Sequence, residues 1–172
     1  FKNKVKQDIE KQFVNQSDQK FFNDCVELLI TNTKIELPEH FVKKLIIANQ
    51  KEKVNENDIE KEFSQSTKGI KYQLIESKLI EENNIDISSD AVKDYAKEMV
   101  KKQMAMYGQN KVDDEELNSI VQRVSSNQDE LKRIYSMLLN EKILNVFKNK
   151  MTKKESKVDY KKFIETAYDK NV

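Results

Sequence analysis

The side chains that most often carry out chemistry are scarce in this sequence. His40 is its only histidine and Cys25 its only cysteine. A zinc site of ordinary composition needs more of these ligands, and the spacing of the other residues does not pair a nucleophile with a base. We therefore predict no catalytic residue, no metal site and no cofactor. We expect Cys25 to be a buried thiol, because it lies in the apolar run 21–30.

Two charged runs could attract ions or nucleic acid. Residues 113–116 are consecutive carboxylates, but they lack the alternating oxygens and the glycine of a calcium loop, so a helix start explains them better. Residues 150–162 carry six lysines and no arginine, which indicates a solvated helix end rather than a nucleic-acid site. The whole chain has 31 basic and 30 acidic residues, a balance that argues against binding to nucleic acid.

Methionines cluster in the segment 99–107, which reads MVKKQMAMY. Methionine is flexible and polarizable, so the cluster either fills a seam between helices or adapts to varied apolar partners. Both interpretations stay open. Met104, Met106 and Tyr107 cannot all point to one side of a helix, so we predict that at least one of them is exposed.

The composition restricts the elements that could position these residues. Two glycines and one proline can supply neither a phosphate-binding glycine loop nor the many turns of an all-β fold. The hydrophobic fraction of 37% lies below the roughly 45–50% of ordinary globular proteins, which favours an open or elongated all-α chain. No apolar run approaches the roughly 18 residues of a membrane span. The sequence begins without methionine and has no signal peptide, so we expect a piece of a longer protein.

Apolar residues recur at helical spacing along most of the chain. We predict a long first helix ending near Asn32, a second starting at Leu37-Pro38-Glu39, a third from about Thr67 to Asn83, a fourth capped by Ser88 and ended by Gly108, two more starting at Asp113 and Asn127, and a tail helix after Asp159. We read residues 51–58 as a loop or a frayed helix end, with Asn57-x-x-Glu60 as a capping pattern for another helix. We expect Gly69 to mark a helix joint or a close helix crossing.

One pattern recurs fifty residues further along the chain. The linker Ile35-Glu36-Leu37-Pro38 and the helix start Phe41-Val42-Lys43 are echoed by Ile85-Asp86-Ile87-Ser88 and Ala91-Val92-Lys93. Either the echo is chance combined with shared helix-start chemistry, or a helix–linker–helix unit is used twice. In the second case the apolar linker residues pin the crossing between two helices while the polar one faces water.

The order and spacing of several motifs give the chain a family resemblance over nearly its whole length. The motifs are Ile35–Val42, Gly69–Ile75, Asn84–Ser88, Met106–Gly108 and Lys150–Glu155. In this order they resemble the C-terminal chaperone domain of bacterial trigger factor. A similar helical module occurs in the periplasmic chaperone SurA, but the order of the motifs favours trigger factor.

The resemblance implies an elongated all-α chaperone domain with a long N-terminal body helix and two helical-hairpin arms. It places the body helix at residues 1–37, the first arm at 38–108, the second arm at 109–150 and a tail that packs on the body at 151–172. It also implies a cytoplasmic, ATP-independent chaperone linked to protein folding and cell division. The family's ribosome-docking and peptidyl-prolyl isomerase domains are not part of this sequence, so we expect ribosome contact only through a missing domain and no enzyme activity.

The resemblance implies unfolded or nascent polypeptides as partners. The charge balance and the lack of a long apolar run predict no nucleic-acid partner and no membrane contact, and the sequence leaves a homodimer open. Wide apolar faces, rather than the family's own contacts, select the client-binding candidates: Met99, Met104, Met106, Tyr107, Tyr135, Met137 and Phe147. Core packing is an equal alternative for each of them. A structural adaptor with one fixed protein partner, or a SurA-like periplasmic module, is the competing interpretation of the whole chain.

Overall fold

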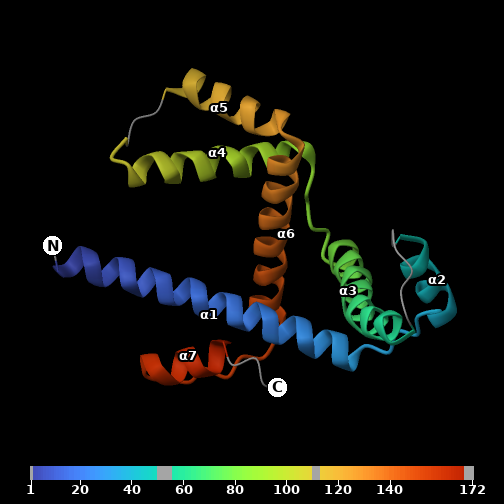
Figure 1. Ribbon diagram of the computed structural model, residues 1–172. Helices are drawn as coiled ribbons and strands as arrows, with labels where there is room; N and C mark the ends of the chain where they lie inside the picture. Colours follow the sequence, from blue (N-terminus) through green and yellow to red (C-terminus); the bar gives the residue numbers. More distant parts are fainter. Residues whose placement is uncertain (1, 50–55, 110–112, 169–172) are drawn as a thin grey trace. The chain divides into compact units, whose positions relative to one another are not determined.

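A computed structural model describes residues 2–49, 56–109 and 113–168, and within these ranges the chain forms seven helices and no strand (Figure 1). The helices are α1 (Lys2–Asn32), α2 (Glu39–Asn49), α3 (Glu56–Glu82), α4 (Ser89–Met106), α5 (Asp114–Ser126), α6 (Gln128–Lys150) and α7 (Tyr160–Tyr168). The predicted all-α class is confirmed. None of the helices in the described ranges is long and apolar enough to cross a membrane.

Most of the predicted helix ends agree with the structure, because the sequence carries the capping residues. Ser88 caps α4 by accepting a hydrogen bond from the Ala91 N–H at 3.3 Å. Gly108 follows the end of α4 with a φ of 84°, and the Gln109 N–H then reaches back to the Met104 carbonyl at 3.0 Å. This left-handed glycine satisfies carbonyls that a helix end leaves open.

α3 differs from the sequence-based expectation in two respects. Glu56–Asp58 belong to the helix, so the loop alternative is wrong for these residues and the helical alternative holds; residues 51–55 lie outside the described residues. Gly69 lies inside the unbroken helix, so the expected joint is wrong. A Cβ at Gly69 would meet no atom within 4 Å, so no described helix crosses closely at this point.

The first of two compact units contains residues 1–78 and 152–172. Within it, α7 packs on α1 (Figure 1), where the Phe13 ring meets the rings of Tyr160 and Phe163 at centroid distances of 5.8 and 6.2 Å. The Lys68 ammonium of α3 pairs with the Glu27 carboxylate of α1 at 3.0 Å. Cys25 is buried in this unit, as predicted.

The second unit contains residues 79–151 and is built from α4, α5 and α6, which contact one another in pairs (Figure 1). Its hydrophobic core takes side chains from all three helices: Val92 and Ala96 from α4, Val121 from α5, and Ile134 and Leu138 from α6. These positions are four residues apart on α4 and on α6, so each helix presents one apolar row. This grouping keeps α4 with α5 and α6, whereas the arms implied by the resemblance divide at residue 108; that division stays a prediction.

The internal repeat is confirmed in local structure. α1 ends at Asn32 and α3 at Glu82, while α2 begins at Glu39 and α4 at Ser89. Burial repeats at the same interval in three pairs: Cys25 with Ile75, Val42 with Val92, and Ile46 with Ala96. In both linkers the apolar residues Ile35, Leu37, Ile85 and Ile87 are half-buried, while Glu36 and Asp86 are exposed. One helix–linker–helix unit therefore occurs twice in the chain.

Candidate functional site

The two side chains with the greatest chemical reactivity are those of His40 and Cys25. His40 is exposed in the first turn of α2, and Cys25 is a buried thiol whose pKa is raised by burial and by the neighbouring Asp24 carboxylate. The carboxylates of residues 113–116 are exposed around the start of α5. Within the described part of the chain, no three histidine, cysteine, aspartate or glutamate side chains gather as metal ligands would.

The methionine segment divides into a packed part and an exposed part. Met99 packs against the core of the second unit, and Met104 is half-buried. Met106 and Tyr107, at the end of α4, are each 80% exposed, which confirms that at least one residue of this group faces solvent. Met99 therefore fits the seam interpretation, while partner binding by Met106 and Tyr107 stays a prediction. Gly108 sets the boundary, because its left-handed backbone turns the chain away immediately after Tyr107.

The candidates on α6 are placed in three different ways. Tyr135 lines a cavity of ≈ 300 Å³ in the second unit. The cavity is lined by Ile87, Ser89, Val92, Lys93, Ser125, Leu131 and Tyr135, so it is mainly apolar and could take an apolar side chain. Met137 is partly exposed. Phe147 is 1% exposed, so a client could touch it only if it first became accessible.

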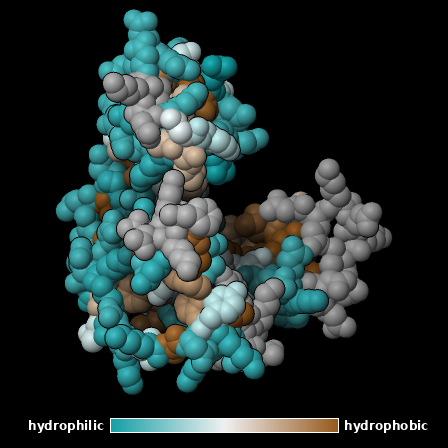
Figure 2. Space-filling model, turned by 90° about the vertical axis from the view of Figure 1, so that its left-hand side faces the viewer, coloured by the Kyte–Doolittle hydropathy of each residue, from teal (hydrophilic) through white to brown (hydrophobic). Residues whose placement is uncertain are grey.

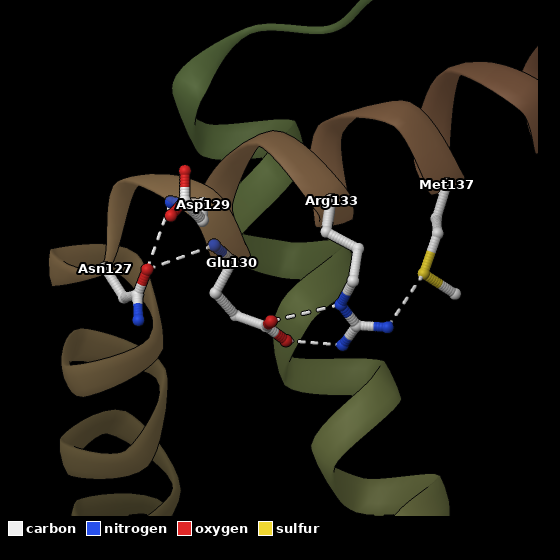
Figure 3. A network of polar contacts seen from close by, with 5 residues as sticks. All are labelled: Asn127, Asp129, Glu130, Arg133 and Met137. Carbon is white, nitrogen blue, oxygen red and sulfur yellow. Dashed lines mark hydrogen bonds and ion pairs between the residues drawn. The ribbon is translucent and has the colours of Figure 1, made fainter.

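Polar contacts fix the first turns of α6 (Figure 3). The side-chain carbonyl of Asn127 accepts hydrogen bonds from the backbone N–H groups of Asp129 and Glu130 at 3.0 and 3.2 Å. The Glu130 carboxylate pairs with the Arg133 guanidinium, which holds the pKa of Glu130 below its usual range. Arg133 also approaches the Met137 sulfur at 3.6 Å. Both side chains are more than one third exposed, so the contact orients Met137 and contributes little stability.

The basic run at residues 150–162 is exposed, except for the half-buried Met151. Within the first unit, the Lys153 ammonium lies 6.0 Å from the centroid of the Phe21 ring. This contact binds the segment after α6 to α1 through a cation and an aromatic face. Lys153 therefore has a contact within the protein that explains its position without a nucleic-acid ligand.

Several exposed apolar residues were not among the predicted site residues. They are Val14, Leu28, Phe41, Leu45, Ile47 and Leu74, and each is more than one third exposed. The apolar pattern of α2 includes Phe41 and Leu45 beside the buried Val42 and Ile46, and periodicity does not tell a packed row from an open one. On the face drawn in Figure 2, hydrophobic residues (brown) reach the surface among hydrophilic ones (teal).

A comparison with protein families shows which family the chain resembles. The family model described as "Probable trigger factor, C-terminal domain" matches residues 17–166. The matched range includes the repeat, the three-helix unit and the start of α7. Searches of curated proteins and of solved structures found no match.

Proposed function

We propose that this chain, which belongs to the trigger factor C-terminal domain family, holds unfolded or nascent polypeptides through dispersed apolar patches and without ATP. The family suggests a chaperone role, and the holding mechanism is our addition to it. We propose no catalytic step for the chain. The cytoplasmic location, the ribosome contact of the complete protein and the homodimer stay predictions from the resemblance.

The observation that supports this proposal is that exposed apolar side chains occur on several different helices. Phe41 and Leu45 lie on α2, Leu74 lies on α3, and Met106 and Tyr107 lie at the end of α4. Separate small patches bind many apolar segments weakly and release them, whereas one deep pocket selects a single ligand. The charged residues around them, 35% of the chain with a net charge of +1, keep such a surface in solution.

The test is the suppression of aggregation of several unrelated denatured proteins. A holding chaperone suppresses aggregation of most of them in the absence of ATP, whereas an adaptor with one fixed partner suppresses none. If the full chain fails against every client at several-fold molar excess, the holding role is rejected for this chain.

A pair of variants then asks whether the exposed end of α4 takes part. The double variant Met106→Ser/Tyr107→Ser should need a several-fold higher concentration for the same suppression, because both side chains are almost fully exposed. The matched control, Lys102→Ser/Gln103→Ser, changes two exposed polar residues of the same helix and should suppress like the parent. Equal loss in both variants would remove Met106 and Tyr107 from the proposed binding surface.

A further inference from the structure

α2 and α4 are equivalent helices of the repeat, so their faces can be compared residue by residue. Val42 and Ile46 form the buried row of α2, and Val92 and Ala96 form the buried row of α4. One position before each of these lies a second row. It consists of Phe41 and Leu45 on α2 and of Ala91 and Tyr95 on α4.

In the second unit this second row of α4 is covered. Ala91 and Tyr95 are partly buried against the core cluster that includes Ile134 and Leu138 of α6. Burial, followed by the nearby Glu141 carboxylate of α6, raises the pKa of Tyr95. α6 therefore lies against this row of α4, and α5 contributes Val121 to the same core.

In the first unit the contacts between α2 and α3 centre on Lys43. The Lys43 ammonium pairs with the carboxylates of Glu39 and Glu60, and it lies 5.1 Å from the centroid of the Phe63 ring of α3. The second row of α2 is nevertheless open, since Phe41 is 63% and Leu45 48% exposed. Within the described residues, α2 has no counterpart of α6.

We propose that the row formed by Phe41 and Leu45 binds an amphipathic helix of a client, in the way that α6 lies on α4. The inference rests on the proposed chaperone function and names the kind of client segment that this surface takes. The bound helix carries two aliphatic residues four positions apart, as α6 carries Ile134 and Leu138. It also carries a carboxylate near them, as α6 carries Glu141, and this group faces the exposed side of α2 that bears His40 and Lys44.

Helix geometry favours a helical client over an extended one at this row. Residues four apart on a helix form a ridge that fits the groove between the corresponding ridges of a second helix. A bound helix also satisfies its own backbone hydrogen bonds, whereas an extended segment gains most from pairing with a sheet edge. The described part of this chain contains no strand that could offer such an edge.

The probe is a synthetic peptide with the sequence of residues 128–142 and the substitution Tyr135→Trp. The protein contains no tryptophan, so the peptide alone supplies the tryptophan emission. Titration with the 172-residue chain should give a saturable blue shift of that emission. A version of the peptide that is chemically locked as a helix should bind more tightly, and a version with Leu138→Pro should bind at least about tenfold more weakly.

Two nearly matched leucines locate the site. Leu45 is 48% and Leu74 49% exposed, on α2 and α3 of the same unit. Leu45→Ser should weaken peptide binding by about tenfold or more, as a central apolar contact does, while Leu74→Ser should leave it unchanged. Phe41→Ser should act like Leu45→Ser. Circular dichroism should show the parent helicity in all three variants, because the replaced side chains are exposed.

Each other result overturns the inference. If Leu45→Ser binds the peptide as tightly as the parent, the peptide binds at another site. If the locked helix binds more weakly than the unlocked peptide, the surface takes an extended segment instead of a helix. Loss of a homodimer on Leu45→Ser in analytical ultracentrifugation makes the row an interface between copies. Suppression of aggregation without peptide binding rejects helix docking and leaves the holding role, whereas peptide binding without suppression rejects the holding role.

Discussion

Val42 and Val92 lie fifty residues apart in the chain and occupy the same position of two equivalent helices, where each is 5% exposed. The two valines are therefore buried at the same step of the repeat, Val42 in the first unit and Val92 in the second. Their equal burial indicates that the same side of α2 and of α4 packs against the rest of its own unit. The other sides of the two helices differ in exposure. The first prediction follows from this equivalence.

Val42→Ala and Val92→Ala should each lower the free energy of unfolding by about 1–3 kcal/mol, since each removes buried methyl groups and leaves a cavity. Hydrogen exchange should show the loss in the first unit for Val42→Ala and in the second for Val92→Ala. The control is Val14→Ala on α1, where the valine is 57% exposed and the expected change is within about 0.5 kcal/mol. An effect of Val42→Ala as small as that of the control would contradict the burial of this row.

The two glycines of the chain should respond to alanine with opposite signs. Gly69→Ala should stabilise the protein by about 0.5–1 kcal/mol, because the site is helical and a Cβ meets open space. Gly108→Ala should destabilise it by about 1–2 kcal/mol, because φ at this residue is 84°. Urea unfolding of the two variants beside the parent measures both changes. If Gly69→Ala destabilised the protein instead, a close contact at Gly69 would be indicated, as the glycine in a helical pattern suggests.

Helix existence and most helix ends could be predicted from the sequence because they depend on local chemistry. Ser88, Asn127 and Gly108 act through hydrogen bonds and backbone angles within a few residues of themselves. Apolar periodicity marks the third helix only from about Thr67, since residues 56–66 are strongly polar. The capping pattern Asn57-x-x-Glu60 lies next to the observed start at Glu56.

The candidate site was harder to predict than the fold. Phe147 lies within α6 and Tyr107 caps the end of α4; both side chains are large and aromatic, yet one residue is 1% and the other 80% exposed. Burial of this kind depends on which helices meet in three dimensions, and periodicity cannot supply that. The repeat was the better guide, because it compares two helices whose local sequence is alike and whose surroundings differ.

Asn127 and Asp113 precede α6 and α5, and they should contribute unequally to the free energy of unfolding. Asn127→Ala should destabilise the second unit by about 0.5–2 kcal/mol, because the Asn127 side chain accepts two backbone hydrogen bonds at the start of α6. Asp113→Ala should cost less, since the Asp113 side chain makes no capping hydrogen bond to α5. Thermal unfolding of both variants in parallel makes the comparison. An equal loss would mean that charge near the helix start, rather than the hydrogen bond, sets the contribution.

Docking of α7 should depend on Phe13. An isolated helix of nine residues is unstable in water, so α7 owes its helical state to packing on α1. Phe13→Ala removes both aromatic contacts, each of which contributes about 0.5–1.5 kcal/mol beyond the area that it buries. We expect faster hydrogen exchange in Tyr160–Tyr168 and unchanged exchange in α5. The neighbouring substitution Val14→Ala is the control and should leave α7 protected.

Asp86 should make the stability of the second unit depend on pH. The Asp86 carboxylate accepts a hydrogen bond from the Ser88 N–H at 2.8 Å, and this bond, with the nearby Lys142, holds the pKa of Asp86 below its usual range. A carboxyl whose pKa is lower in the folded state than in the unfolded one stabilises the fold above its unfolded-state pKa of about 3.9. That contribution disappears as the pH falls through the lower, folded-state pKa.

Asp86→Asn keeps an acceptor oxygen at this position and removes the charge. The parent should therefore be more stable than Asp86→Asn at pH 7, and the difference should shrink as the pH falls below about 4. The urea midpoint of each protein, measured from pH 7 to pH 3, gives that difference, in which the titration of all other carboxylates cancels to first order. A difference that stays constant over this range would show that Asp86 acts only as a neutral hydrogen-bond acceptor at the start of α4.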